Sequence, residues 1–459
     1  MDPLQVIYDR APIPLQHAMT TLSGYQRNRS RYGRTYWQHR EWLADFDGWS
    51  LAEKLEHQAA ELRDFIRYAT EHSPYYRRLY STTDLDEVRT PENLGLLPII
   101  EKEELRTNAS DIYTVSRRWA VEGHTGGTTG KSLVVLMTRD DMMKRMAMLD
   151  HFKARVGFEH RKMRRATFSG KHIVPPGQNR SVFWRYNHAC RQMLYSTFDL
   201  TESNLCHYIR SLNDFKPNAI DGFFTSMVDV ANYIERHDIK LQFSPVAIFP
   251  TSETVTPSGR ETLERVFRSK VYDQYASSEG APFVTQCRYG SMHVELASGV
   301  FEQLNGTDNE ILVTSFTTHG TPLIRYRIGD SMVIGEPTEC RCGIQSPLVR
   351  SIEGRRDDYL FRSDGAKINA GNVANLFKNM PNSLVKAQLI QESMGDVTIL
   401  LVVDEARYRP DDDALLLKEA RHKFGATTRI TIRHVDDIPR ERSGKHRLIK
   451  NSLAARSDG

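Results

Sequence analysis

Cysteine and long hydrophobic runs are both scarce in this sequence. Five cysteines among 459 residues form an odd and sparse set, which disfavours a disulfide framework and favours a reducing cytoplasm. The longest apolar runs, such as residues 397–403, fall far below the roughly 18 residues that a membrane span needs. Residues 1–10 show no apolar core behind a basic start, so we expect no secretory signal. These absences predict a cytoplasmic protein without a membrane partner.

An excess of charge of one sign is also missing. The 62 Lys and Arg residues and the 58 Asp and Glu residues leave a formal net charge of only +4. This balance argues against a protein that coats nucleic acid, and we expect no nucleic-acid partner. Hydrophobic residues make up 39% of the chain, which is enough to bury sizeable cores and argues against global disorder.

The order of apolar and polar residues predicts the fold class. No internal repeat is present, and the length predicts two or three domains. Apolar residues on one face predict a helix from Leu51 that ends at Pro74. A helix at 226–237, a strand at 246–249, a helix at 261–268 and a strand at 270–275 alternate, which favours an α/β fold with largely parallel sheets. Residues 1–50 lack a clean period and suggest no role.

The pattern changes near Gly354. A charged run at 355–358 precedes a strand at 397–403, a helix at 412–424 and a strand at 429–434. We therefore predict a large N-terminal domain, residues 1–354, with mostly parallel sheets and helices, and a small α+β C-terminal domain, residues 355–459.

The sharpest local signal is the run Thr125, Gly126, Gly127, Thr128, Thr129, Gly130 and Lys131. Glycines let the backbone approach a bulky anion, and threonine hydroxyls and loop amides can donate hydrogen bonds to phosphate oxygens. The run is one residue short of the common nucleotide-binding pattern G-x-x-x-x-G-K-[ST]. A hairpin turn between two strands is the alternative, because residues 132–137 are strand-like.

Five motifs in order carry a family resemblance. Residues 125–131 resemble the loop of the adenylate-forming enzymes, which include acyl-CoA synthetases and peptide-synthetase adenylation domains. Y-A-S-S-E at 275–279, Y-R-I-G-D at 326–330, G-R-R-D-D at 354–358 and R-S-G-K at 442–445 follow in the family's order. P-L-I-R-Y-R at 322–327 and C-R-C-G at 340–343 resemble the branch that holds phenylacetate–coenzyme A ligases and CapK-type capsule proteins. Gly126 and Ala276 depart from the commoner Ser and Gly of the family.

The resemblance implies a site for ATP and Mg²⁺. Glu279 is the implied magnesium ligand, a hard carboxylate for a hard cation. Lys445 would approach the α-phosphate, because charge must be neutralised as a carboxylate attacks it. The other implied nucleotide contacts are the loop 125–131, Tyr275, Ser278, Asp330 on the ribose hydroxyls, and Arg355. Each residue also has a plain alternative: a surface acid for Glu279, a core ring for Tyr275, a turn for Asp330, and solvated charges for Arg355 and Lys445.

Two further features follow from the resemblance. Asp357 matches the family's hinge, about which a mobile small domain rotates to bring Lys445 in for adenylation and out for transfer. The acyl pocket is implied at Phe223, Phe224, Phe249 and Ser252, although such aromatic side chains also serve as core.

Four residues could hold zinc. Cys287 and His293, together with Cys340 and Cys342, offer three thiolates and one imidazole, a sensible tetrahedral shell for a structural Zn²⁺. Separate buried cysteines are the alternative.

The predicted activity is ATP-dependent activation of a carboxylic acid as an acyl-adenylate, followed by transfer to coenzyme A. The partners would be a small carboxylic acid, ATP, and CoA or another acceptor, and a homodimer is left open. One alternative is adenylyl or acyl transfer without CoA in capsule or secondary-metabolite biosynthesis. Another is a degenerate nucleotide-binding partner protein, against which Glu279, Asp330 and Lys445 argue.

Overall fold

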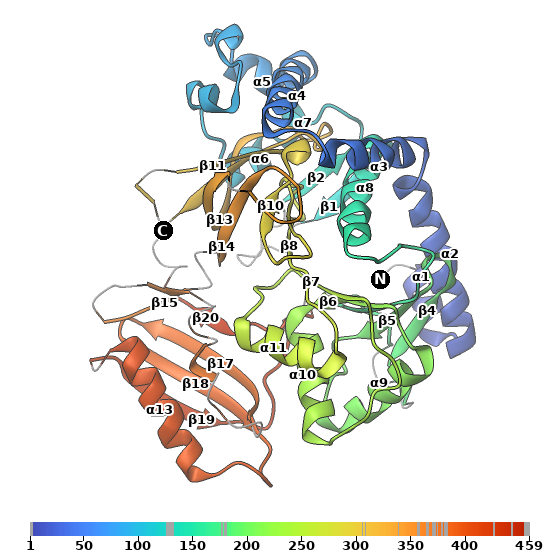
Figure 1. Cartoon of the computed structure of the whole chain (residues 1–459), viewed down its shortest axis with the longest axis vertical. Coiled ribbons are helices and arrows are strands. Elements are labelled where there is room, and N and C mark those ends of the chain that lie inside the picture. The colour runs from blue at the N-terminus through green and yellow to red at the C-terminus, as the bar shows by residue number, and fades with distance from the viewer. Residues whose placement is uncertain are drawn as a thin grey trace. The chain divides into compact units, whose positions relative to one another are not determined.

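The computed structural model describes residues 3–124, 133–175, 178, 181–304, 306–307, 309–337, 339–355, 359–363, 367–369, 373, 375–377, 380, 384–425, 427–441 and 444–453. The chain forms two compact units, and Figure 1 shows their helices and strands. The first unit comprises residues 1–22, 161–271 and 353–459, and the second comprises residues 23–160 and 272–352. The C-terminal residues therefore group with residues 161–271, and the predicted boundary at residue 354 stays a prediction.

A five-stranded sheet lies in the first unit, in the order β4-β5-β3-β6-β7. Its central strands are parallel, and β4 pairs antiparallel with β5 at one edge. The predicted helix at 226–237, strand at 246–249 and helix at 261–268 are confirmed here, whereas only residues 274–275 of the predicted strand 270–275 form a strand, and that strand belongs to the second unit. The elements are β3 (Arg165–Ser169), β4 (Trp184–Asn187), β5 (Gln192–Ser196), α9 (Glu202–Phe215), β6 (Ala219–Phe223), α10 (Phe224–Arg236), β7 (Ala247–Thr251) and α11 (Pro257–Phe267). Apolar side chains of the sheet and these helices share one core.

The C-terminal part of the first unit has a core of its own. A four-stranded sheet in the order β19-β18-β17-β20 packs beside α13, which buries Leu416, Ala420 and Phe424. The elements are β15 (Tyr359–Phe361), β16 (Lys367–Asn369), β17 (Leu384–Ser393), β18 (Asp396–Val403), α13 (Pro410–Phe424), β19 (Arg429–His434) and β20 (Ile449–Asn451). The strands and the helix predicted after residue 396 are confirmed.

The second unit is built on a seven-stranded sheet in the order β11-β12-β13-β14-β10-β9-β8. Its strands are β8 (Gln274–Tyr275), β9 (Val284–Gln286), β10 (Met292–Val294), β11 (Gly299–Gln303), β12 (Glu310–Ser315), β13 (Leu323–Pro337) and β14 (Pro347–Arg355). Every pairing described in this sheet is antiparallel. The prediction of largely parallel sheets is therefore wrong for this unit, because strands joined by short turns fold back on one another.

Helices and a small hairpin complete the second unit. They are α3 (Arg34–Asp47), α4 (Leu51–His72), α5 (Pro74–Leu79), α6 (Lys102–Thr107), α7 (Ala109–Ile112), β1 (Val121–His124), β2 (Val134–Met137) and α8 (Arg139–Arg155). A capping box between Ser50 and Glu53 begins α4, and one between Thr138 and Asp141 begins α8. The predicted stop before Pro74 is confirmed.

Residues 3–31, for which the sequence suggested no period, form α1 (Pro3–Arg10) and α2 (Ile13–Arg31). Within residues 3–22, polar side chains bond to the exposed edge of β4: the amide of Tyr186 donates to Nδ1 of His17 at 2.8 Å. None of the described helices is both long and apolar enough to cross a bilayer.

Candidate active site

In the second unit, the structure brings together Tyr275 and Asp330, which are 55 residues apart in the sequence. The hydroxyl of Tyr275, in β8, donates to Oδ2 of Asp330, in β13, at 2.7 Å. Gly329 has φ +81, a left-handed conformation that glycine adopts easily and that turns the chain just before Asp330. Both side chains are buried, so this hydrogen-bonded pair lies in the protein interior and not at the exposed edge of a pocket.

Glu279 is buried within a tight turn after β8. The amide of Ala281 donates to Oγ of Ser277 at 3.0 Å, and Gly280 has φ +101. The hairpin β1–β2 lies against this turn, because a methyl group at Gly123 would stand 3.1 Å from the carbonyl oxygen of Ser278. Thr125 to Lys131 lie outside the described residues. The strands that flank them pair antiparallel.

Arg145 was not identified from the sequence, yet it holds the Glu279 turn. This buried guanidinium extends from α8, and its Nη1 donates to the carbonyl oxygens of Gly280 at 2.8 Å and Ala281 at 3.0 Å. It also donates to Oγ1 of Thr317 at 2.9 Å and stands 4.3 Å from the centre of the Phe283 ring. Burial lowers the pKa of Arg145 to about 10. No local pattern could reveal the contact, because 135 residues separate Arg145 from Gly280.

In the first unit, Lys445 lies against the predicted acyl-pocket residues. Its Nζ donates to the carbonyl oxygen of Ser252 at 3.0 Å and stands 5.9 Å from the centre of the Phe223 ring. Ser252 has φ +65, which turns its carbonyl at the end of β7. Phe224 packs in the core, so close to α11 that a methyl group at Gly259 would overlap its ring. Phe249 is also fully buried.

Glu253 is a second residue that the motifs did not indicate. Its carboxylate accepts the backbone amide of Thr225 at 2.8 Å and the hydroxyl of the same residue at 3.0 Å, so it caps the start of α10. Burial raises the pKa of Glu253 to about 7, although the hydrogen bonds from Thr225 and the charges of Arg440 and Lys445 act in the opposite direction.

The segment that carries Lys445 is anchored to residues 161–271. Arg440 donates to Oδ2 of Asp229 at 2.6 Å and to Oγ of Ser226 at 2.9 Å. Gly444, with φ +79, approaches so closely that a methyl group there would stand 2.7 Å from Cα of Gly170. Arg442 and Ser443 lie outside the described residues, as does the predicted hinge residue Asp357. The backbone of Arg355 ends β14, and its side chain is outside the described part of the chain.

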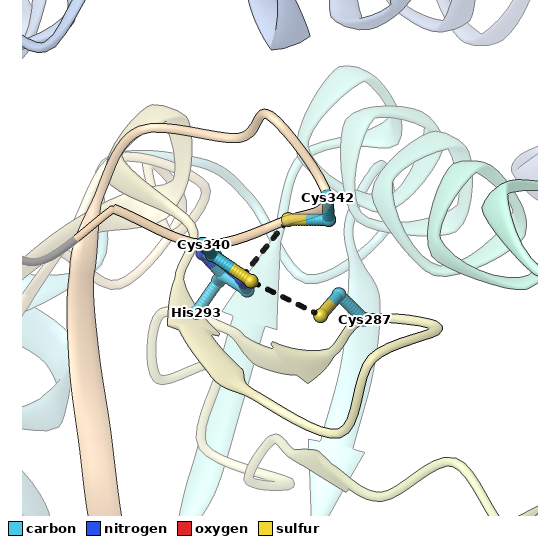
Figure 2. Close-up of side chains that lie close together, drawn as sticks. All are labelled: Cys287, His293, Cys340 and Cys342. Atoms are coloured by element: carbon cyan, nitrogen blue, oxygen red, sulfur yellow. Dashed lines mark hydrogen bonds between the residues drawn. The ribbon is translucent and has the colours of Figure 1, made fainter.

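The four predicted zinc ligands converge in the second unit (Figure 2). Their ligand atoms all lie within 4.8 Å of one another. Sγ of Cys287 is 3.7 Å from Sγ of Cys340, and Sγ of Cys342 is 3.3 Å from Nε2 of His293. Tetrahedral zinc with ordinary bond lengths implies about 3.8 Å between two sulfur ligands and about 3.6 Å between sulfur and nitrogen ligands. The donor set and its spacing therefore fit Zn²⁺.

A further contact orients the imidazole of this cluster. Nδ1 of His293 lies 3.0 Å from Oγ of Ser346, which leaves Nε2 to face Cys342. Outer hydrogen bonds of this kind fix the tautomer of a metal-binding histidine. The β10–β14 pairing sets His293 opposite Leu348 and so brings the two halves of the cluster together.

Comparison with solved structures identifies the fold. The solved structure of 2-hydroxyisobutyryl-CoA ligase in the postadenylation state in complex with 2-HIB-AMP has a TM-score of 0.71 to this chain, at 18% identity, over 90% of this chain and 92% of that one. The fold is therefore that of the adenylate-forming CoA ligases.

Relatives with similar sequences identify the family to which the chain belongs. Protein CapK of Staphylococcus aureus is 32% identical over 98% of this chain and 100% of its own length. The family model of the CapK C-terminal domain matches residues 360–452. The phenylacetate-coenzyme A ligase of Thermus thermophilus is 22% identical over 85% of this chain and 95% of its own. The chain belongs to the CapK family.

Proposed function

We propose that this protein activates a carboxylic acid with ATP as an acyl-adenylate and then transfers the acyl group to coenzyme A. The observation that carries the proposal is the Glu279 turn, with Tyr275 paired to Asp330 beside it. Similarity to a phenylacetate-coenzyme A ligase along 85% of the chain supports the reaction class, and so does the fold shared with a ligase solved with an acyl-AMP.

Each residue has a defined task in this reaction. Glu279 would hold Mg²⁺, which supplies charge neutralisation on the phosphates when bound. Asp330, kept in place by Tyr275, would accept the ribose hydroxyls. Lys445, which donates a hydrogen bond to the carbonyl oxygen of Ser252, would neutralise charge at the α-phosphate as the carboxylate of the substrate attacks it. The loop 125–131 would contact the other phosphates.

Transfer to the thiol requires a second arrangement, for which we retain the division at residue 354 and the hinge at Asp357. The contacts of Arg440 with Asp229 and Ser226 and the close approach of Gly444 are the ones that rotation must break. These contacts hold the lysine segment in one defined position, and the proposed transfer step needs a second position in which they are broken.

The zinc ion in this proposal is structural. Three thiolates and one imidazole fill all four positions of a tetrahedral ion and leave none for substrate. The cluster joins the β9–β10 hairpin to the segment between β13 and β14, at the end of the sheet that carries Tyr275.

A CoA-independent reaction is the second candidate. The indoleacetate–lysine synthetase of Pseudomonas savastanoi is 22% identical over 56% of this chain and 65% of its own length, and its name specifies an amine acceptor. A degenerate nucleotide-binding protein is disfavoured because Glu279, Asp330 and Lys445 are all retained.

The test is pyrophosphate release from ATP with a panel of aliphatic and aromatic carboxylic acids, with and without CoA. We expect one acid class to stimulate release and acyl-CoA to form. Release without CoA consumption, with transfer to an amine, would select the second candidate. No release with any acid, from protein that carries an intact fold, would refute both. Glu279→Gln is the matched inactive control.

A further inference from the structure

Helix α2 packs with its polar side inward. Gln16 and Thr20 are buried, whereas Leu15 is 48% exposed and Leu22 is 60% exposed. Leu15, Ala18 and Leu22 are three and four residues apart, so they form one stripe along the helix. Ile7 of α1 is likewise 56% exposed. A surface helix ordinarily shows the reverse arrangement, with its apolar stripe toward the core.

The edge strand β4 explains the inversion. Its unpaired backbone groups need partners, and α2 supplies polar ones: the amide of Tyr186 donates to His17 at 2.8 Å, and the amide of His188 donates to Oγ1 of Thr21 at 3.1 Å. Nε of the fully buried Arg185 donates to Oε1 of Gln16 at 2.7 Å. Because the polar side chains of α2 face the strand, its apolar side chains face outward.

Arginine is the only charged residue type from residue 10 to residue 40, and the one carboxylate in α1 is that of Asp9. Residues 10–40 contain six arginines and no lysine, aspartate or glutamate, although the whole chain is nearly neutral. Arg10 at the end of α1 and Arg29 near the end of α2 are exposed. Apolar side chains flanked by arginines are typical of helices that lie in the plane of an anionic membrane surface.

We propose that the N-terminal apolar face, defined as Ile7, Leu15, Ala18 and Leu22, rests on an anionic lipid bilayer. A second copy of this chain fits the charges less well, since the six arginines of residues 10–40 would meet their own copies with only Asp9 of α1 as a carboxylate. The expectation of no membrane partner concerned a spanning segment, whereas this helix pair lies flat. The proposal does not depend on the reaction that the protein catalyses.

The experiment is co-sedimentation of the full-length protein with vesicles of phosphatidylcholine alone and of phosphatidylcholine with phosphatidylglycerol. We expect binding to the anionic vesicles, weakened by salt. Leu15→Asp with Leu22→Asp should weaken it at least tenfold. Arg10→Gln with Arg29→Gln, which leaves the apolar stripe intact, should weaken it several-fold. The matched control is Met394→Asp, at an equally exposed apolar residue of the turn after β17.

Three results would overturn the proposal. The protein could stay in solution with both vesicle types, or it could bind neutral and anionic vesicles equally. Light scattering could also reveal a dimer that the Leu15 and Leu22 substitutions dissociate, in which case the face binds a second copy of the chain.

Discussion

Replacing Arg145 with methionine should damage the Glu279 turn more than it damages the fold. Methionine retains the apolar volume and removes every donor. Two N–H groups on Nη1 serve Gly280, Ala281 and Thr317, and hydrogen bonds of a charged group are worth about 1.5–3 kcal/mol each. The contact with the Phe283 ring adds about 1–2 kcal/mol.

The desolvation of the guanidinium offsets part of this sum. Burial lowers the pKa of Arg145 from 12.5 to about 10, which corresponds to about 3 kcal/mol against the charged form. We therefore expect Arg145→Met to destabilise the second unit by about 3 kcal/mol. For a cooperative unit of this size, each kcal/mol lowers the melting temperature by about 2–4 °C, so Tm should fall by about 6–12 °C.

The assay compares melting with ATP–pyrophosphate exchange over a range of Mg²⁺ concentrations. Because Gly280 follows Glu279 directly, Arg145→Met should raise the Mg²⁺ needed for half-maximal exchange by about tenfold, equivalent to about 1.4 kcal/mol. Leu62→Ala is the matched control: Leu62 is fully buried in α4, and its truncation costs about 2–5 kcal/mol without touching the turn. If both variants lose stability equally and neither shifts the Mg²⁺ dependence, Arg145 is ordinary core and the reasoning fails.

Four further outcomes are expected. Lys445→Ala should lower pyrophosphate exchange by about a thousandfold or more while ATP binding, measured by calorimetry, is retained. Cys342→Ser should reduce zinc from about one equivalent to a small fraction and lower Tm, whereas Cys206→Ser, at an exposed cysteine of α9, should change neither. In the folded protein the pKa of Glu253 is raised from 4.5 to about 7, so the free energy of unfolding should fall as pH rises between these two values. Glu253→Gln should remove this pH dependence, and the difference in Tm between about pH 5 and pH 8 should become smaller. Asp357→Pro should keep exchange within about tenfold and lower thioester formation about a hundredfold, because proline fixes φ at the proposed hinge.

Each of these has a contrary result. Near-normal exchange in Lys445→Ala would remove the lysine from the reaction, and metal-free wild-type protein of unchanged stability would exclude zinc. An unchanged pH profile in Glu253→Gln would mean that another group titrates. Equal losses of both half-reactions in Asp357→Pro would point to a damaged fold.

The sequence predicted elements whose evidence is local. The apolar period of α4, the run of β18 and the alternation through α10, β7 and α11 all follow from neighbouring residues. The antiparallel sheet of the second unit was missed, because the alternation of strands with helices is restricted to the first unit. The zinc ligands were predicted as a chemical set, yet their meeting depends on the β10–β14 pairing, which no local pattern specifies.

Arg145 and the capping role of Glu253 could not be predicted from the sequence for a related reason. Arg145 and Glu253 lie outside the five motifs and act on segments that are distant in sequence. Arg145 reaches a carbonyl 135 residues away, and Glu253 caps a helix that begins 29 residues before it. The sequence did not predict α2, because the residues that this helix buries are polar, whereas a surface helix ordinarily buries its apolar residues.

Because α2 covers β4, it also prevents the edge of this sheet from pairing with a strand of another copy of the chain. A strand at the edge of a sheet is a template on which other chains can add, and proteins commonly block such edges. His17 and Thr21 occupy backbone groups of Tyr186 and His188 that would otherwise be open to a neighbouring chain. A truncation that begins after residue 22 would therefore yield a protein prone to aggregate, even with every motif of the reaction intact.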